Sequence, residues 1–452
     1  MMTSAGKPAH ITIGELAQAG MRNLPSFLRS SEHLIYSSPA TLAFNSPGAE
    51  GFGVKRAGLA IPGSVMLIVS PGCCGRNTTL ISRIPAYDHR FFYYSLEERD
   101  IVTGRHLSKI PEAAAEIVKS LPEAPSVLMI CITCVDALLG TDLERVCRKA
   151  QEAAGIPVRP CYMYALTREG NRPPMVHVRE SLYALLKPLP RRSDAVNLLG
   201  YFSPLMPDCE LYDLLRQVGV RTIREISTCE NYEAFQQMAA AHFSLLLNPE
   251  GRFAARDMSE HLGIPYIELA RLHDPKRIRR QYRALGRALD VSFDDDAYFA
   301  AAQERADRFA ADHADLRIAV GERINADPFE LSYALAGSGL TVCEIYGTVT
   351  EENFPWIRAL AAVSPGTKVF SNLDPSMICY EASDSEVTFA LGADACYYHS
   401  DCPGTGWNSE VQPFGYAGLR AMYEAMEDAL TDGADGSCVN LTADPVSGGG
   451  RL

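Results

Sequence analysis

The sequence predicts an α/β protein made of three Rossmann-like domains with mainly parallel sheets, similar to one another in architecture. Two observations lead to this prediction. Short runs of consecutive apolar residues recur along the chain, and such runs are typical of strands buried on both faces of a sheet. Amphipathic segments of helical period lie between the runs, and this alternation indicates parallel strands that are joined by crossover helices.

The expected strands are spread over most of the chain. They cover residues 64–70, 126–133, 195–202, 242–248, 316–321, 340–347 and 367–372. The clearest helical segments are 110–120 and 141–154, because their apolar residues fall on one face of a helix.

Two polar stretches divide this series of strands. The charged, Pro-containing stretch 187–194 (KPLPRRSD) predicts a first linker, and the polar helical region 290–315 predicts a second. We therefore expect domains at 1–190, 191–315 and 316–452. The residues after Asp432 are rich in Gly, Ser and Asp, which predicts a flexible tail.

Composition limits the classes of protein that are compatible with the chain. Its 452 residues, 47% of them hydrophobic, can build ordinary cores for two or three domains. The net charge of -13 argues against a nucleic-acid partner. No apolar signal segment and no stretch of about 18 apolar residues is visible, so we expect a cytoplasmic protein with no membrane contact. We therefore expect most of the 13 cysteines to be buried free thiols and not disulfides.

Two cysteine clusters follow two of the predicted strands. Strand 64–70 leads into Cys73 and Cys74, and strand 126–132 leads into Cys134, with Cys131 three residues earlier. Ligands of open parallel sheets bind beyond the carboxyl ends of the strands, where the start of a helix also stabilises a thiolate. Thiolates suit iron–sulfur clusters, and flanking glycines let a bulky cluster approach the backbone. We expect Cys73 and Cys134 as first ligands, with Cys74 and Cys131 as further candidates.

Other interpretations of these cysteines stay open at this point. The spacing of Cys131 and Cys134 is also typical of zinc sites, although Cys131 is expected inside the strand and no knuckle-type glycine follows it. A thioredoxin-like redox pair and ordinary core packing are the remaining alternatives.

The runs SPGCCGRNT, FFYYSLEERDIVTG and CITCVDALLGTDLERVCRKA resemble the first domain of the nitrogenase component 1 family. The run HFSLLLNPEGRFAARDMSEHLGIPYIEL resembles the family's middle domain, and PFGYAGLRAMYEAMEDAL resembles its closing helix. The resemblance extends over roughly residues 43–430. It implies that Cys73 and Cys134 match two of the family's cluster ligands.

The chain departs from the family pattern in ways that leave the cluster type open. Subunits with a bridging cluster usually carry another cysteine before the first strand, but residues 44–48 contain Asn45 and Ser46 and no cysteine. Either of these residues, Cys74 or Cys131 would then complete the ligation. The resemblance is compatible with an 8Fe-7S P-cluster and with a 4Fe-4S cluster.

A second departure concerns the catalytic cofactor. The ungapped match places Leu247 where the family's alpha subunit has its cofactor cysteine, and it gives the cofactor histidine a counterpart in His399. We therefore expect a beta-type subunit whose partner carries the catalytic iron–sulfur cofactor. His399 is then either a polar loop residue or a metal ligand.

The resemblance implies an oxidoreductase subunit that relays electrons in a two-component system. The expected partners are an alpha-type subunit, in a heterotetramer, an ATP-hydrolysing iron protein and a small-molecule substrate. Methylthio-alkane reductase, which cleaves carbon–sulfur bonds reductively, is the first expectation. A dark-operative tetrapyrrole reductase, a non-catalytic scaffold for assembly of the nitrogenase cofactor and a cluster-free α/β protein are the alternatives.

Overall fold

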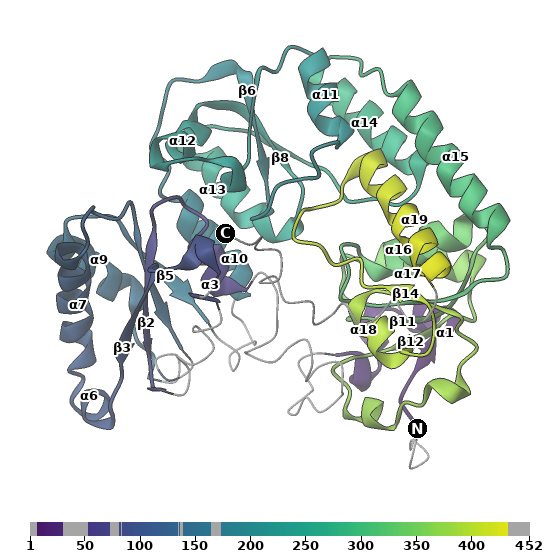
Figure 1. Cartoon of the computed structure of the whole chain (residues 1–452), viewed down its shortest axis with the longest axis horizontal. Coiled ribbons are helices and arrows are strands. Elements are labelled where there is room, and N and C mark those ends of the chain that lie inside the picture. The colour runs from purple at the N-terminus through teal and green to yellow at the C-terminus, as the bar shows by residue number, and fades with distance from the viewer. Residues whose placement is uncertain are drawn as a thin grey trace, which may run out of the picture. The chain divides into compact units, whose positions relative to one another are not determined.

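The computed structural model describes residues 7–29, 53–72, 81, 82, 84–133, 135, 139–163 and 173–432. Within these residues the strands form three separate sheets, and every pairing is parallel except that of one short strand (Figure 1). The predicted α/β class with mainly parallel sheets is therefore confirmed. Each predicted strand is present, with ends shifted by a few residues.

The first sheet is a four-stranded parallel sheet that is covered by helices on both faces. Its strand order is β3 (Phe91–Ser95), β2 (Val65–Ser70), β4 (Leu128–Ile132), β5 (Val158–Tyr162). Alternate residues of β2 and β4 belong to two different apolar clusters, one on each face. One cluster includes side chains of α3 (Val54–Gly58) and α10 (Pro174–Tyr183), and the other includes side chains of α7 (His106–Ser120) and α9 (Leu143–Ala154). Two buried faces explain the uninterrupted apolar sequence of β2 and β4.

The second sheet repeats this arrangement on a smaller scale. Its strand order is β7 (Thr222–Arg224), β6 (Arg192–Leu199), β8 (Ala241–Leu246), β9 (Tyr266–Glu268). Strand β6 begins inside the stretch expected as the first linker. Helix α13 (Arg252–Leu262) follows β8 and leads into β9.

The third sheet has six strands. Their order is β1 (Ile11–Thr12), β12 (Lys368–Phe370), β11 (Thr341–Tyr346), β10 (Arg317–Val320), β13 (Phe389–Leu391), β14 (Gly404–Thr405). Strand β1 pairs antiparallel with β12 and comes from the opposite end of the sequence. Helices α16 (Pro328–Gly337), α17 (Phe354–Val363) and α18 (Ala393–Tyr398) connect or follow the strands.

A group of helices packs together in the same part of the chain as the third sheet. It consists of α11 (Glu210–Gln217), α14 (Pro275–Leu289), α15 (Asp296–Asp312) and α19 (Gly415–Asp432). The buried carboxylate of Glu210 accepts the backbone N–H groups of Tyr416 (2.7 Å) and Ala417 (3.0 Å) at the start of α19. Gly415 has a φ of 64°, and a Cβ there would overlap this carboxylate, which explains the glycine.

Contacts divide the chain into two compact units that are both discontinuous in sequence. One comprises residues 1–50, 205–218 and 271–452, and the other comprises 51–204 and 219–270. The division into three domains at 190 and 315 stays a prediction. Within the described residues, no helix has the length and apolar character that a membrane crossing requires.

Candidate functional site

The strands that lead into Cys73 and Cys134 are direct neighbours. Strands β2 and β4 pair in parallel, and Val69 lies opposite Ile132 at their carboxyl ends. Paired strands are about 4.8 Å apart, so β2 and β4 end at adjacent points of the same edge of the sheet. Cys73 follows the last residue of β2 by three positions, and Cys134 follows the last residue of β4 by two. Cys73, Cys74 and Cys134 themselves lie outside the described residues, as do Asn45 and Ser46.

The polar residues at the ends of these two strands differ in their hydrogen bonding. At the end of β2, the hydroxyl of Tyr93 donates to the Ser70 carbonyl oxygen at 2.8 Å and accepts from the Ser70 hydroxyl at 3.2 Å. At the end of β4, the fully buried Thr133 Oγ1 has no hydrogen-bond partner among the described residues. Buried hydroxyls rarely stay unpaired. Among the described residues the Thr133 hydroxyl thus has no acceptor, and a donor at this position, directly before Cys134, fits a group with sulfur acceptors.

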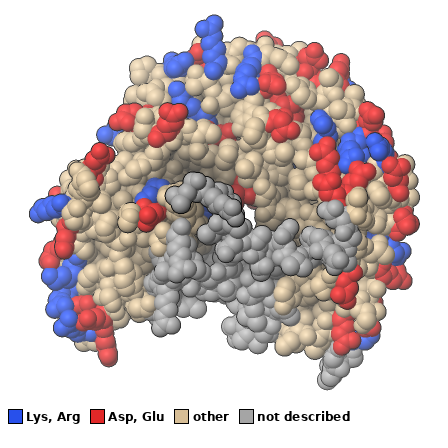
Figure 2. Space-filling view, viewed as in Figure 1, with Lys and Arg blue, Asp and Glu red and all other residues tan. Residues whose placement is uncertain are grey.

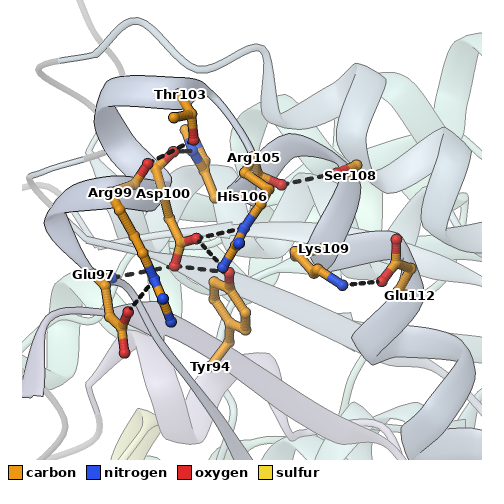
Figure 3. Close-up of polar contacts among 10 residues, drawn as sticks. All are labelled: Tyr94, Glu97, Arg99, Asp100, Thr103, Arg105, His106, Ser108, Lys109 and Glu112. Atoms are coloured by element: carbon orange, nitrogen blue, oxygen red, sulfur yellow. Dashed lines mark hydrogen bonds and ion pairs between the residues drawn. The ribbon is translucent and has the colours of Figure 1, made fainter.

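A buried carboxylate fixes the segment that follows β3 at the same edge of the sheet. Asp100 of α6 (Glu98–Thr103) accepts hydrogen bonds from Arg105 Nε at 3.0 Å and from the Tyr94 hydroxyl at 3.2 Å (Figure 3). Burial tends to raise the pKa of Asp100, but the hydrogen bonds from Glu97 N–H, Tyr94 and Arg105 outweigh it and lower the pKa. The Nδ1 of His106 lies 3.0 Å from the Asp100 carbonyl oxygen, which ties α6 to the start of α7.

This edge also exposes apolar side chains. Val102 on α6 is 79% exposed, and Leu139, which follows β4, is 46% exposed. Contiguous apolar patches are typical of surfaces that bind another protein, and Val102 and Leu139 are candidate members of such a patch.

Cys131 lies inside β4, where the sequence places it, and its side chain is fully buried in the first sheet. It is opposite Cys161 of β5 and belongs to the apolar cluster that faces α3 and α10. The Cys161 thiol donates to the Val54 carbonyl oxygen at 3.8 Å, and the neighbouring Cys131 sulfur together with burial raises the pKa of Cys161 well above its usual range. The side chain of Cys131 thus lies inside the core, opposite a second thiol. Its role as a cluster ligand stays a prediction.

His399 is buried at the C-terminal end of α18 rather than placed in an open loop. Its Nε2 lies 2.9 Å from the Tyr380 hydroxyl, 3.0 Å from the Tyr346 hydroxyl and 3.4 Å from Glu344 Oε2. The same Glu344 oxygen is 2.7 Å from the Tyr380 hydroxyl and 2.9 Å from the Tyr346 hydroxyl, and Ser385 donates to the other oxygen at 2.7 Å.

Counting protons assigns the donors in this cluster. A carboxylate only accepts, so the single proton of each tyrosine points to Glu344. A proton on the His399 Nε2 would then face the two phenol oxygens, and the role of His399 as a metal ligand stays a prediction. Burial tends to raise the pKa of Glu344, but the bonds from His399, Tyr380, Ser385 and Tyr346 lower it to about 2. Among the described residues, no three His, Cys, Asp or Glu side chains are arranged to hold a metal ion.

Sequence reasoning singled out His399 but missed its partners. The one available signal is Glu344 itself, a charged residue inside the apolar strand LTVCEIYG. Tyr380 and Ser385 come from a segment without regular strand pattern, and nothing local in the sequence indicates that they meet Glu344.

Leu247, the residue at the position of the family's cofactor cysteine, is a core side chain. It directly follows β8, is 2% exposed, and its backbone N–H donates to the Leu199 carbonyl oxygen at 2.8 Å. No thiolate is available at the end of β8 to bind a cofactor.

Comparison with known proteins identifies related sequences. Residues 50–326 match the family model described as nitrogenase component 1 type oxidoreductase. The nitrogenase iron-molybdenum cofactor biosynthesis protein NifE of Klebsiella pneumoniae is 28% identical over 245 residues, which cover 49% of this chain and 53% of that protein. NifE of Nostoc sp. is 28% identical over 181 residues, which cover 39% of this chain and 37% of that protein. The chain thus spans about half the length, or less, of these curated relatives.

A solved structure described as nitrogenase Cp1 at pH 6.5 has a similar fold. It superposes with a TM-score of 0.65 over 91% of this chain and 97% of that chain, at 16% sequence identity. At this identity the superposition shows a common fold alone.

Proposed function

The chain belongs to the nitrogenase component 1 type oxidoreductase family, and from this premise we propose that it holds an iron–sulfur cluster and acts as a scaffold subunit for assembly of a nitrogenase-type cofactor. The cluster part of the proposal rests on one observation, the pairing of β2 with β4 in register up to Val69 and Ile132. The scaffold part is supported by the similarity to NifE proteins, which are named for cofactor biosynthesis.

Cys73 and Cys134 are the proposed first ligands, because their strands end side by side. Cys74, Cys131 or Asn45 would complete the ligation, and Thr133 would donate a hydrogen bond to a cluster or cysteine sulfur. Such a cluster supplies one-electron transfer when it is bound. The protein contributes the thiolates, the buried surroundings and the hydrogen bonds that set the potential.

Two observations favour a scaffold over a subunit that holds a catalytic cofactor. Leu247 is buried where a cofactor thiolate would be needed, and the Nε2 of His399 is already used by Glu344, Tyr346 and Tyr380. An alpha-type chain in a heterotetramer is the proposed partner, as is typical of the family. The exposed Val102 and Leu139 are the proposed contact for an ATP-hydrolysing iron protein.

The second candidate is a nitrogenase-like reductase that relays electrons to a catalytic cofactor in the partner, with reductive cleavage of methylthio-alkanes as its reaction. The exposed apolar edge next to the proposed cluster favours this candidate, because a reductase needs to dock close to the electron acceptor. Iron analysis of the complex, purified without oxygen, separates the candidates. About eight irons at the interface would favour the relay, and about four would favour a scaffold or a tetrapyrrole reductase.

Turnover distinguishes an enzyme from a scaffold. The complex is supplied with an iron protein, ATP and a methylthio-alkane, and the released thiol is measured. A scaffold is expected to show no turnover but to transfer its cofactor to a cofactor-free nitrogenase component. Multiple turnovers would contradict the scaffold proposal.

The ligand assignment is tested by substitution. Cys73→Ala and Cys134→Ala are each expected to lose most of the cluster iron and its visible absorption, because removal of the thiolate leaves an iron without a ligand. Iron content and absorption spectra of the anaerobic complexes measure this. The matched control is Cys343→Ser, a half-buried thiol in β11, which is expected to keep the iron. Full iron content in both alanine variants would refute the assignment.

The role of Thr133 is tested independently of activity. Thr133→Val keeps the shape of the side chain but removes the donor, so the more negative, reduced cluster loses stabilisation. One hydrogen bond corresponds to a fall in midpoint potential of roughly 20–60 mV. A redox titration followed by electron paramagnetic resonance measures the shift, and Thr133→Ser is expected to retain the native potential. An unchanged potential in the valine variant would show that this hydroxyl does not reach the cluster.

A further inference from the structure

Helix α14 carries a row of exposed cations that have no acidic partner in the part of the chain that the structure describes. Lys276, Arg280, Arg283 and Arg287 are exposed and lie four, three and four residues apart. This spacing places all four on one narrow face of the helix, over about 17 Å. The opposite face is buried through Ile278, Tyr282 and Leu285.

The cations of this row repel each other within the folded chain. Like charges three or four residues apart destabilise a helix. The neighbouring Arg279 is paired with Asp295 and Asp296, and Arg277 is paired with Glu330, but none of the four exposed cations is in an ion pair among the described residues. The row is therefore a cationic surface that no described acidic residue pairs with, in a chain whose net charge is -13.

Helix α15, which follows α14 and packs against it, has an exposed face of opposite charge (Figure 1). Glu304 and Asp307 are exposed, one helical turn apart, and have no ion pair among the described residues; Asp315 extends the same charge beyond the end of the helix. The one exposed cation of α15 is Arg308, and it is paired with Asp312. Figure 2 shows acidic and basic side chains side by side along the edge where α15 lies in Figure 1.

We propose that the α14–α15 hairpin is a self-association surface that binds a second copy of this chain. Only residues 290–295 connect the two helices, and the helices contact each other. In a two-fold pair, the cationic row of α14 faces the acidic face of the partner's α15, and the reverse contact forms at the same time. Each attraction is thus made twice, which is a property of an isologous interface.

A second copy satisfies these charges better than a nucleic acid does. A polyanion would neutralise α14 but would meet the acidic face of α15 next to it, and the chain as a whole repels it. Exposed residues between the charges are alanines, namely Ala284 and Ala288 on α14 and Ala297 and Ala300 on α15. These small side chains let two helices approach closely enough for the charges to pair. This inference does not depend on the proposed cluster.

The test uses two complementary charge reversals in the full-length chain. Arg280→Glu with Arg283→Glu makes both helices acidic, and Glu304→Lys with Asp307→Lys makes both helices basic. Sedimentation velocity at low salt is expected to show a dimer for the wild type and a monomer for each variant alone. An equimolar mixture of the two variants is expected to form a dimer again, because each acidic helix then meets a basic one.

Two controls separate this contact from general charge effects. Lys119→Glu with Arg148→Glu changes the net charge as much as the acidic variant does, but on exposed positions of α7 and α9, and is expected to leave the dimer intact. About 1 M NaCl, where the Debye length is about 3 Å, is expected to weaken the wild-type dimer at least tenfold.

Several outcomes would overturn the proposal. They are a wild type that is monomeric at low salt, reversal variants that associate like the wild type, and a mixture that stays monomeric. Binding of heparin to the α14 row of a monomeric wild type would assign the row to a polyanion and would likewise exclude the second-copy contact.

Discussion

Glu344 is a single carboxylate that holds a segment of the third sheet together. It accepts hydrogen bonds from Tyr346, Tyr380 and Ser385, and His399 faces the same oxygen as the two tyrosines. Because these bonds lower its pKa from 4.5 to about 2, the ionised form stabilises the folded state. This stabilisation is fully present above pH 4.5 and is lost as the pH falls toward 2. Its size is about 3 kcal/mol.

Glu344→Gln is therefore expected to lower the free energy of unfolding at pH 7 more than at pH 3. The wild type loses a large part of the contribution of the carboxylate over this range, whereas the variant never has it. Urea unfolding at both pH values measures the difference. The exposed Glu351→Gln serves as the control and is expected to change stability little at either pH. An equal effect of Glu344→Gln at both pH values would contradict the assignment of the ionised form.

The Gly-Tyr-x-Gly motif is explained in part by the contacts of its first two residues. The Gly-Tyr-x-Gly sequence at the start of α19 resembles a family motif, and the structure gives its glycine and tyrosine a local role. Gly415 leaves room for the carboxylate of Glu210, and the Tyr416 hydroxyl donates to Asp295 at 2.6 Å. Both partners are more than 100 residues away in sequence, so the motif by itself does not reveal what it contacts.

At the scale of elements, the sequence predicts the central strands well and the edge strands poorly. Strands β2 and β4 are buried on both faces and read as continuous apolar runs. The edge strands β3, β7 and β9 contain half-buried or exposed positions, so their composition does not separate them from loops. The polar region 290–315, interpreted as a boundary, is largely helix α15, which packs against α19.

Asp142, at the start of helix α9, either caps this helix or takes part in the proposed cluster site, and substitutions distinguish the two roles. Asp142 belongs to the segment that resembles the family motif after Cys134, and its Oδ1 accepts the Arg145 N–H at 3.0 Å at the start of α9. Asp142→Ala is expected to cost about 1 kcal/mol of stability, and Asp142→Asn is expected to cost less because asparagine also caps helices. Urea unfolding measures both. Both variants are expected to keep the cluster iron; selective loss of iron at native stability would instead place Asp142 in the site.

At the scale of the whole molecule, the two compact units are each assembled from distant parts of the sequence. Residues 205–218 join the unit that contains the third sheet, although they follow β6 of the second sheet. Glu210 in this segment is bonded to the start of α19, about 200 residues later. Long-range contacts of this kind cannot be recognised from the local composition of a linker. Candidate linkers in the sequence therefore do not by themselves identify the compact units of the fold.

The charge of the whole molecule is likewise a poor guide to its surfaces. A net charge of -13 argues against a nucleic-acid partner, yet α14 exposes four cations in one row. The sum of charges says nothing about their distribution, which depends on which helix faces are buried. In the proposed two-fold contact, the cations of α14, which repel one another within one copy, attract the carboxylates on α15 of the second copy.

The sequence alone determined the fold class and the central strands, because these follow from local periodicity, and it places Cys73 and Cys134 directly after two of these strands. Only the tertiary structure decided which strands are neighbours, so only it brought the ends of β2 and β4 to one edge and buried the Thr133 hydroxyl where no other described residue pairs with it. It alone placed Glu344, Tyr346 and Tyr380 around His399. The physical reason is that pairing and burial depend on contacts between residues far apart in the chain, which local patterns do not record.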